Sequence, residues 1–200
     1  MRRLVLSVLL LSLVLVPRAQ AYRLEYREQL WELFHLQLYY YPERIAENVV
    51  WLQQALEAPF ANPLYALAEI QNETEWEKYR YLFTMHIYVK LVDMHILWAS
   101  KFFKLDAFFF NYPWREDNLR SIERAEELLS LGLLYWEQAV AMAREIERWP
   151  WVHLEELAQW EDEAWRINTG DLDYEAIIGR HLDRLNEVRE RFENMDESTY

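Results

Sequence analysis

The 200-residue chain contains no cysteine and only 3 glycines. Without cysteine it has no disulfide, no lipid-modified amino terminus and no cysteine nucleophile. Glycine normally makes up about 7% of a protein, and so few glycines leave no glycine-rich loop to cradle phosphate groups. The sequence therefore excludes most nucleotide-binding folds, and a stable structure must rest on core packing alone.

The first 21 residues have the three-part pattern of a cleavable signal peptide. Arg2 and Arg3 give a positive start, residues 4–16 are uninterruptedly apolar, and Ala19-Gln20-Ala21 is a small-x-small cleavage site. The apolar run has 13 residues, whereas a membrane-spanning helix needs roughly 20, so a retained anchor is the less favoured alternative. The pattern predicts export by the general secretory route, a mature chain that starts at Tyr22, and a periplasmic location.

Acidic residues outnumber basic residues by 34 to 21, which gives a formal net charge of −13. Removal of residues 1–21 takes away three arginines and no acid, so the mature chain carries −16. Such a charge repels phosphate backbones and favours basic partner surfaces, so no nucleic-acid partner is expected. No stable membrane span is expected after cleavage either, because charged residues interrupt the apolar stretch at residues 87–110.

Apolar residues recur at three- and four-residue spacing almost throughout, which predicts an all-α fold. Caps and prolines place the expected helices at about residues 24–40, 42–57, 62–70, 72–105, 117–148, 152–168 and 173–192. The helix from Asn72 or Thr74 is apolar nearly all round and is expected at the centre. No flexible linker divides residues 22–200, which predicts one domain with a frayed polar tail from about Glu193.

Antiparallel helices joined by short turns favour either a tetratricopeptide-like array of helical hairpins or an irregular bundle. Each tetratricopeptide unit is a helix-turn-helix of about 34 residues. Leu131-Gly132 followed by Tyr135 matches one fragment of that pattern, and Gly170-Asp171 followed by Tyr174 resembles a second turn. The two fragments do not share a register, so both alternatives stay open.

Candidate metal sites in the sequence are incomplete. Glu32 and His35 supply only half of the pattern that a helical di-iron bundle uses. Asp171, Asp173 and Glu175 alternate like the start of a calcium loop, but the loop's required glycine is missing, and helix capping is the simpler interpretation. No metal and no cofactor are expected.

Catalytic equipment is also sparse, and the protein is not expected to be an enzyme. None of the four mature serines lies in a Gly-x-Ser-x-Gly elbow. A cell-wall glycosidase needs a carboxylate in an apolar cleft, for which Glu75 beside Trp76 and Glu161 beside Trp160 are the candidates. The acidic run Glu155, Glu156, Glu161, Asp162 and Glu163 is most simply a solvated face, with a surface for a basic partner as the alternative. Lys90 and Asp93 are three residues apart on the apolar helix, so they are expected to pair with each other or to bond across to neighbours, as a buried pair that fixes helix register.

Aromatic residues are abundant, with 10 tryptophans and 13 tyrosines, and interfaces favour these residue types. Two aromatic segments fall between expected helices and are therefore candidate partner-contact sites. They comprise Phe108, Phe109, Phe110, Tyr112 and Trp114 in one connection, and Trp149 and Trp151 at a later corner. Alternatively, Trp76, Tyr79 and Phe83 line a helical pocket for a small apolar ligand or peptide.

Three segments carry a family resemblance: residues 62–68 (NPLYALA), 75–86 (EWEKYRYLFTMH) and 109–114 (FFNYPW). They resemble signal-peptide-bearing helical proteins of spirochaetes that are related to tetratricopeptide-like components of the periplasmic flagellar collar. The likeness is best over residues 62–148. The resemblance implies a non-enzymatic scaffold or adaptor, built from helical hairpins, that assembles with other proteins around the flagellar motor.

Overall fold

The computed structural model describes residues 24–105 and 112–198, and the regular secondary structure in these ranges is entirely helical. The α-helices are α2 (Arg27–Tyr40), α3 (Ile45–Glu57), α4 (Glu73–Ser100), α5 (Arg115–Ile146), α6 (Ala158–Thr169) and α7 (Tyr174–Glu193). Short 3-10 turns, η1 (Pro63–Tyr65), η2 (Tyr112–Trp114) and η3 (Glu155–Leu157), lie in the connections. The predicted all-α fold is confirmed. The predicted signal peptide, residues 1–21, lies outside the described ranges.

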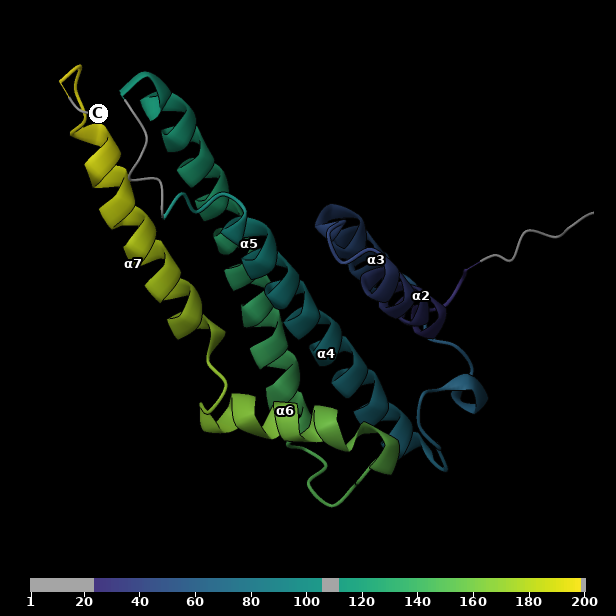
Figure 1. Ribbon diagram of the computed structural model, residues 1–200. Coiled ribbons are helices and arrows are strands. Elements are labelled where there is room, and N and C mark those ends of the chain that lie inside the picture. The colour runs from purple at the N-terminus through teal and green to yellow at the C-terminus, as the bar shows by residue number, and fades with distance from the viewer. Residues whose placement is uncertain (1–23, 106–111, 199–200) are drawn as a thin grey trace, which may run out of the picture.

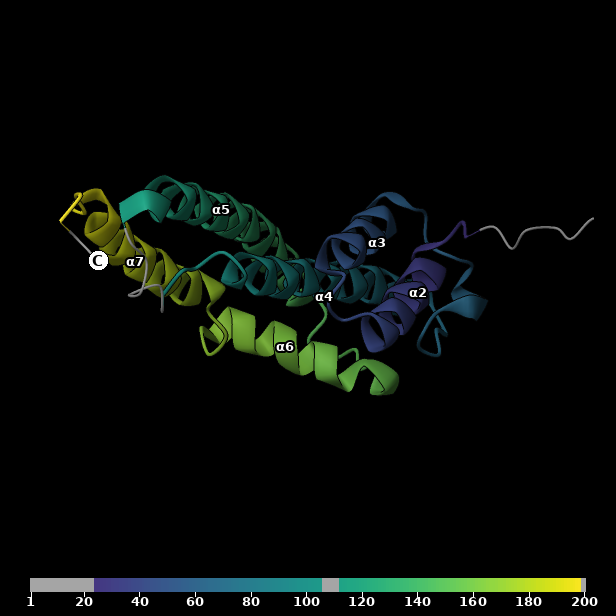
Figure 2. The ribbon, with the colours of Figure 1, turned by 45° about the horizontal axis from the view of Figure 1, so that its top comes forward.

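Helices α4 and α5 form a long antiparallel hairpin, and α7 packs along α5 (Figure 1). Helix α6 crosses the end of this hairpin at which α4 begins and α5 ends. Helices α2 and α3 form a second hairpin on the flank of α4 that is opposite α7 (Figure 2). With 28 residues in α4 and 32 in α5, each helix is nearly as long as a whole tetratricopeptide unit of about 34. The arrangement is therefore the irregular bundle of the two predicted alternatives.

Helix α4 is buried on nearly every side, as its apolar sequence predicted. Its buried apolar residues are Tyr79, Leu82, Phe83, Met85, Ile87, Val89, Leu91, Val92, Met94 and Ala99. Asn72 caps the helix, because its side chain accepts the Glu75 N–H at 3.0 Å and donates to the Glu75 carboxylate at 2.8 Å. No helix in the part of the chain that the structure describes is long and apolar enough to cross a membrane.

Helices α4 and α7 both come close to α5 at Gly132. A Cβ atom at this position would lie 3.3 Å from Ile178 Cδ1 on α7 and 3.6 Å from His95 Cβ on α4. His95 is buried beside this crossing, and its Nδ1 lies 2.7 Å from the Leu91 carbonyl oxygen. Burial lowers the pKa of His95 below its ordinary value, which favours the neutral imidazole in the folded protein.

The predicted helix over residues 62–70 is wrong. Asn62 does cap a turn by accepting the Leu64 N–H, but only Pro63–Tyr65 is helical, and Ala66 is extended. The next backbone amide, that of Leu67, donates to the Tyr79 hydroxyl on α4 at 3.2 Å. This tertiary hydrogen bond takes the place of the helical bond that the sequence pattern predicted.

Other predicted helix limits shift by a few residues. Helix α3 begins at Ile45 rather than Pro42, because Arg44 N–H bonds the Tyr41 carbonyl oxygen in a preceding turn. Helix α4 ends at Ser100 rather than Leu105, and Lys104 has a φ of 54°. Helices α5 and α7 lie within two residues of their predicted limits.

The start of α6 was also predicted too early. Residues 152–157 lead into the helix through the η3 turn, and α6 itself begins at Ala158 rather than Val152. Its end agrees with the prediction, because Gly170 terminates it in the left-handed conformation, with a φ of 81°.

Two glycine substitutions test this helix end. Gly170→Ala places a Cβ in a left-handed backbone conformation, so the free energy of unfolding should fall by about 1 kcal/mol. Gly179→Ala is the matched control, because Gly179 lies inside α7 and its added Cβ meets nothing within 4 Å. Its higher helix propensity should raise the free energy by up to about 1 kcal/mol in urea titrations. Equal effects of the two substitutions would contradict the left-handed end.

Candidate functional site

The predicted corner at Trp149 and Trp151 adjoins a groove between the end of α5 and helix α6. The groove has a volume of about 540 Å³. Its apolar lining consists of Ile146, Trp149, Pro150, Ala164 and Trp165. Trp165 is 58% exposed, and Trp151 beside the groove is 72% exposed. We call Trp149, Trp151, Trp165 and Pro150 the aromatic corner.

The aromatic corner is anchored to the core through Trp149, which is half-buried. Its ring lies 5.7 Å from that of Tyr81 on α4, and the Arg148 guanidinium lies 5.2 Å from the ring centroid. Trp149 is thus held in place by packing, whereas Trp151 and Trp165 present their indoles to solvent. The corner combines one fixed indole with two accessible ones.

The other predicted contact segment lies far from the aromatic corner. Tyr112 and Trp114 are exposed in and around the η2 turn, while Phe108, Phe109 and Phe110 lie outside the described residues. Trp114 precedes α5 and Trp149 follows it, so they are separated by a helix of 32 residues, about 48 Å long. The structure therefore does not bring the two candidate segments together.

Helix α6 is held against α4 by an ion pair and by a histidine–carboxylate contact. Lys78 Nζ lies 2.6 Å from Glu161 Oε1 and also donates to the Val152 carbonyl oxygen. His86 Nδ1 lies 2.5 Å from Glu163 Oε2. Lys78 is only 4% exposed, so it depends on these partners for its charge to be tolerated.

These pairs correct the interpretation of the acidic run at residues 155–163. Glu155, Glu156 and Asp162 are exposed, as a solvated face requires. Glu161 and Glu163 instead point toward α4. The run is therefore divided between a solvated face and a docking face.

Both candidate glycosidase carboxylates are committed to local hydrogen bonds. Glu75 bonds the side chain of Asn72 and the N–H of Gln71 at the start of α4. Glu161 bonds Lys78 and the Leu154 N–H, at 2.6 and 3.2 Å. Glu75 thus stabilises the start of α4, and Glu161 holds α6 against α4.

The predicted aromatic pocket on α4 is filled by packed rings. Trp76 stacks on Tyr79, with ring centroids 5.2 Å apart and an interplanar angle of 11°. Phe60 then covers them, 5.7 Å from the Trp76 ring and 5.6 Å from that of Phe83. Tyr79 and Phe83 belong to the core, and Trp76 and Phe60 pack against it.

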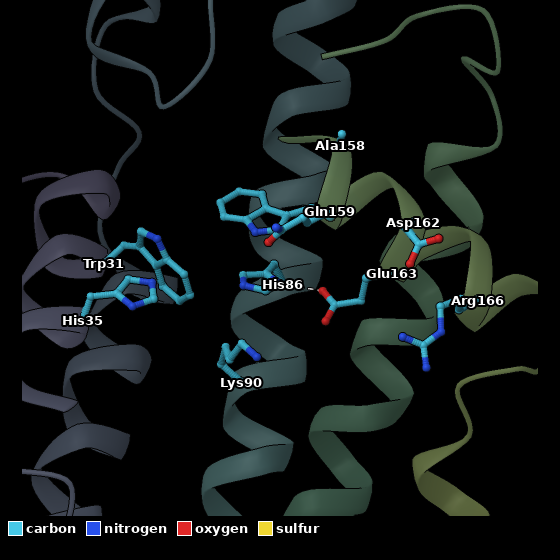
Figure 3. A pocket seen from close by; sticks show the side chains of 10 residues that line it. Trp31, His35, His86, Lys90, Ala158, Gln159, Asp162, Glu163 and Arg166 are labelled. Carbon is cyan, nitrogen blue, oxygen red and sulfur yellow. Dashed lines mark hydrogen bonds and ion pairs between the residues drawn. The ribbon is translucent and has the colours of Figure 1, made fainter. Parts of the chain in front are cut away.

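A cleft that the sequence did not predict lies between α2, α4 and α6 (Figure 3). Its volume is about 750 Å³. The indoles of Trp31 and Trp160 meet at right angles, 5.9 Å apart, on its inner side. The face of the His86 imidazole stacks on the Trp160 indole, with ring centroids 4.5 Å apart. At the edge of the same ring, Nδ1 lies within hydrogen-bond distance of Glu163 Oε2. The α2–α4–α6 cleft thus has an aromatic lining with a histidine–carboxylate pair.

Basic side chains from each of its helices line the cleft: His35 from α2, Lys90 from α4 and Arg166 from α6. Arg166 lies beyond Glu163, on the side away from His35 (Figure 3). Lys90 Nζ lies 3.2 Å from Asp93 Oδ2, so the predicted contact is confirmed. Both side chains are about one-third exposed, so the prediction that this pair is buried is wrong. Asp93 also accepts a hydrogen bond from the Tyr174 hydroxyl.

His35 is the cleft residue with a clearly perturbed acidity. Partial burial lowers the pKa of its imidazole, and the nearby positive groups His86 and Lys90 lower it further. The basic groups of α2 and α4 therefore face one another closely enough to repel.

The candidate metal patterns have structural roles. Asp173 caps α7 by accepting the Ala176 N–H at 3.0 Å, as the capping interpretation predicted. The His35 ring packs on Trp31, with centroids 4.3 Å apart. Within residues 24–105 and 112–198, no group of three or more histidine and carboxylate side chains is placed to hold a metal ion.

The fold and its surfaces define an all-helical bundle with an aromatic corner and a polar cleft. A family model described as a domain of unknown function (DUF8513) matches residues 74–195, which is more than half of the chain. The chain therefore belongs to this family. No curated protein and no solved structure matches it. The family match covers α4 to α7, so the aromatic corner lies inside it, whereas the cleft also uses α2 from the preceding hairpin.

The Lys78–Glu161 pair predicts a specific pattern of stability changes. Glu161→Leu leaves Lys78 charged and nearly buried, so the free energy of unfolding should fall by about 2 kcal/mol or more. The double substitution Lys78→Met, Glu161→Leu should recover most of this loss, because it removes both charges. Glu156→Leu, at an exposed position of the same acidic run, is the control and should change stability by at most about 0.5 kcal/mol. A double variant as unstable as the single one would show that the pair does not dock α6.

Proposed function

We propose that this protein is an exported, non-enzymatic helical scaffold or adaptor that binds another protein through its aromatic corner. The observation that carries the proposal is the exposure of Trp151 and Trp165 beside a groove with an apolar lining. Tryptophan is among the residue types that contribute most to binding energy at protein interfaces. Apolar patches rimmed by polar groups are typical of interaction sites.

The charge around the corner indicates the chemistry of the partner. Glu147 is exposed and lines the groove, and Glu155 and Glu156 are exposed in the η3 turn that leads into α6. These acids are part of the excess that gives the chain a formal net charge of −13. A partner surface with lysine or arginine around an apolar centre would complement this corner, and attraction between the charges would speed association.

The proposed compartment and assembly rest on the sequence. The amino-terminal pattern supports export, and the resemblance to spirochaete collar proteins makes the periplasmic flagellar motor the first assembly to test. Such a scaffold needs rigid presentation of its contact residues. The packing of Trp149 on Tyr81 supports this requirement, because it fixes the corner to the central helix.

Alanine substitutions at the corner test this proposal. Trp151→Ala and Trp165→Ala should each leave the free energy of unfolding within about 0.5 kcal/mol of the parent, because both indoles are exposed. Crosslinking in the native cells, followed by mass spectrometry, should capture a partner with the parent chain and much less with the double variant.

Trp136→Ala is the matched control, because Trp136 is buried on α5 and its truncation should cost about 3–5 kcal/mol. Unchanged capture by the folded double variant would contradict the proposal. Destabilisation by Trp151→Ala as large as that of Trp136→Ala would show instead that the corner is part of the core.

A further inference from the structure

We propose that the α2–α4–α6 cleft binds a small organic carboxylate, with its charged group between His35 and Lys90 and its apolar part against the indoles. This site is separate from the aromatic corner and does not depend on the function proposed there. A volume of about 750 Å³ lies within the usual range of ligand pockets, roughly 300–1,000 Å³.

The aromatic lining of the cleft accounts for the apolar part of the ligand. Trp31 and Trp160 meet edge to face, and both border the cleft. Gln159 and Ala158 continue this wall along α6 (Figure 3). Pockets of this kind bind the apolar body of a ligand by contact and orient it with a few polar groups.

Two of the acids around the cleft already have partners. Glu163 is bound to His86 at 2.5 Å, and Asp93 is bound to Lys90 and to the Tyr174 hydroxyl. The remaining acid of the lining, Asp162, lies on the exposed face of α6. A ligand between α2 and α4 therefore meets His35 and Lys90, and the nearby exposed carboxylate is that of Glu32, one turn before His35 on α2.

The donors of the cleft have unused hydrogen-bonding capacity. The ring nitrogens of His35 and the guanidinium of Arg166 have no hydrogen-bond partner among the residues that the structure describes. Lys90 has three protons and makes one ion pair, with Asp93. An anionic acceptor would satisfy these donors and relieve the repulsion among His35, His86 and Lys90.

The chain as a whole selects a ligand of low charge. Its formal charge of −13 opposes the approach of a multiply charged anion. A single carboxylate meets less of this repulsion while still pairing with Lys90. The aromatic wall adds affinity only if the ligand also carries an apolar group. A small monocarboxylate with an aromatic or aliphatic body fits both conditions.

Binding should take up a proton at the cleft. In the free protein, burial and positive neighbours lower the pKa of His35, and a bound carboxylate would raise it again. The affinity should therefore rise as the pH falls below the ordinary histidine pKa of about 6.5, because His35 gains its charge there more readily with the carboxylate bound. The titratable groups around His35 are His86 and Lys90 on α4, Glu163 on α6, and Glu32 on α2 itself.

The test uses three probes that share one aromatic body: phenylpropanoate, phenylpropanamide and phenylpropylamine. Each is titrated into the folded chain, and the indole N–H signals of Trp31 and Trp160 are followed by NMR. Phenylpropanoate should bind saturably and at least about tenfold more tightly than the neutral amide or the cationic amine. Inorganic phosphate, which lacks the apolar body, should bind more weakly than phenylpropanoate.

Two substitutions locate the carboxylate. His35→Gln and Lys90→Met should each weaken phenylpropanoate binding by about tenfold, and His35→Gln should flatten its dependence on pH. The matched controls are His153→Gln and Lys101→Met, because both residues are exposed and neither lines the cleft. Thermal unfolding of each variant confirms that it is folded.

The proposal is overturned if phenylpropanoate does not bind, or if the amide or the amine binds as tightly. It is also overturned if phosphate binds as well as phenylpropanoate, since the indoles would then have no part in the site. Unchanged binding in folded His35→Gln and Lys90→Met would exclude the site named here.

Discussion

The burial of α4 on almost every side is the constraint on which the rest of the structure depends. The apolar side chains of α4 satisfy this constraint by packing against α3 and α5. Lys78, His86 and His95, however, place polar atoms in the same buried surface. Each of these atoms must find a partner inside the protein, because an unpaired buried polar group costs about 1–3 kcal/mol and an unpaired buried charge about 3–5 kcal/mol. His95 finds a carbonyl oxygen on its own helix, whereas Lys78 and His86 require Glu161 and Glu163. The position of α6 follows from that requirement.

The placement of α6 creates both surfaces that we interpret as functional. On one side of α6, its distance from the end of α5 leaves the groove in which Trp165 is exposed. On the other side, its approach to α2 leaves the cleft at which Trp160 and Glu163 meet His86. The central helix is thus mostly covered, and both surfaces lie where shorter elements meet it.

The sequence predicted the helices well because long amphipathic patterns and caps such as Asn72 and Asp173 are local features. It failed at residues 62–70 because the hydroxyl of Tyr79, a tertiary partner, replaces a helical hydrogen bond there. Trp151, which is exposed, was a candidate contact residue because it lies at a corner, whereas the exposed Trp165 was missed because it lies within a helix. The cleft was missed because His86 and Glu163 are 77 residues apart, and no local pattern joins them. The only local signal was a repeated four-residue spacing, Trp31 with His35 and His86 with Lys90, which places each pair on one helix face.

The most direct test of this account is native-state hydrogen exchange, followed residue by residue along the chain. If α4 is the buried centre to which the other elements are docked, amides of residues 79–95 should exchange only through global unfolding. Amides of the corner at residues 149–157 should then exchange at least about a hundredfold faster, through local opening. If residues 79–95 exchanged as fast as the corner, α4 could not be the rigid centre, and the account would be contradicted.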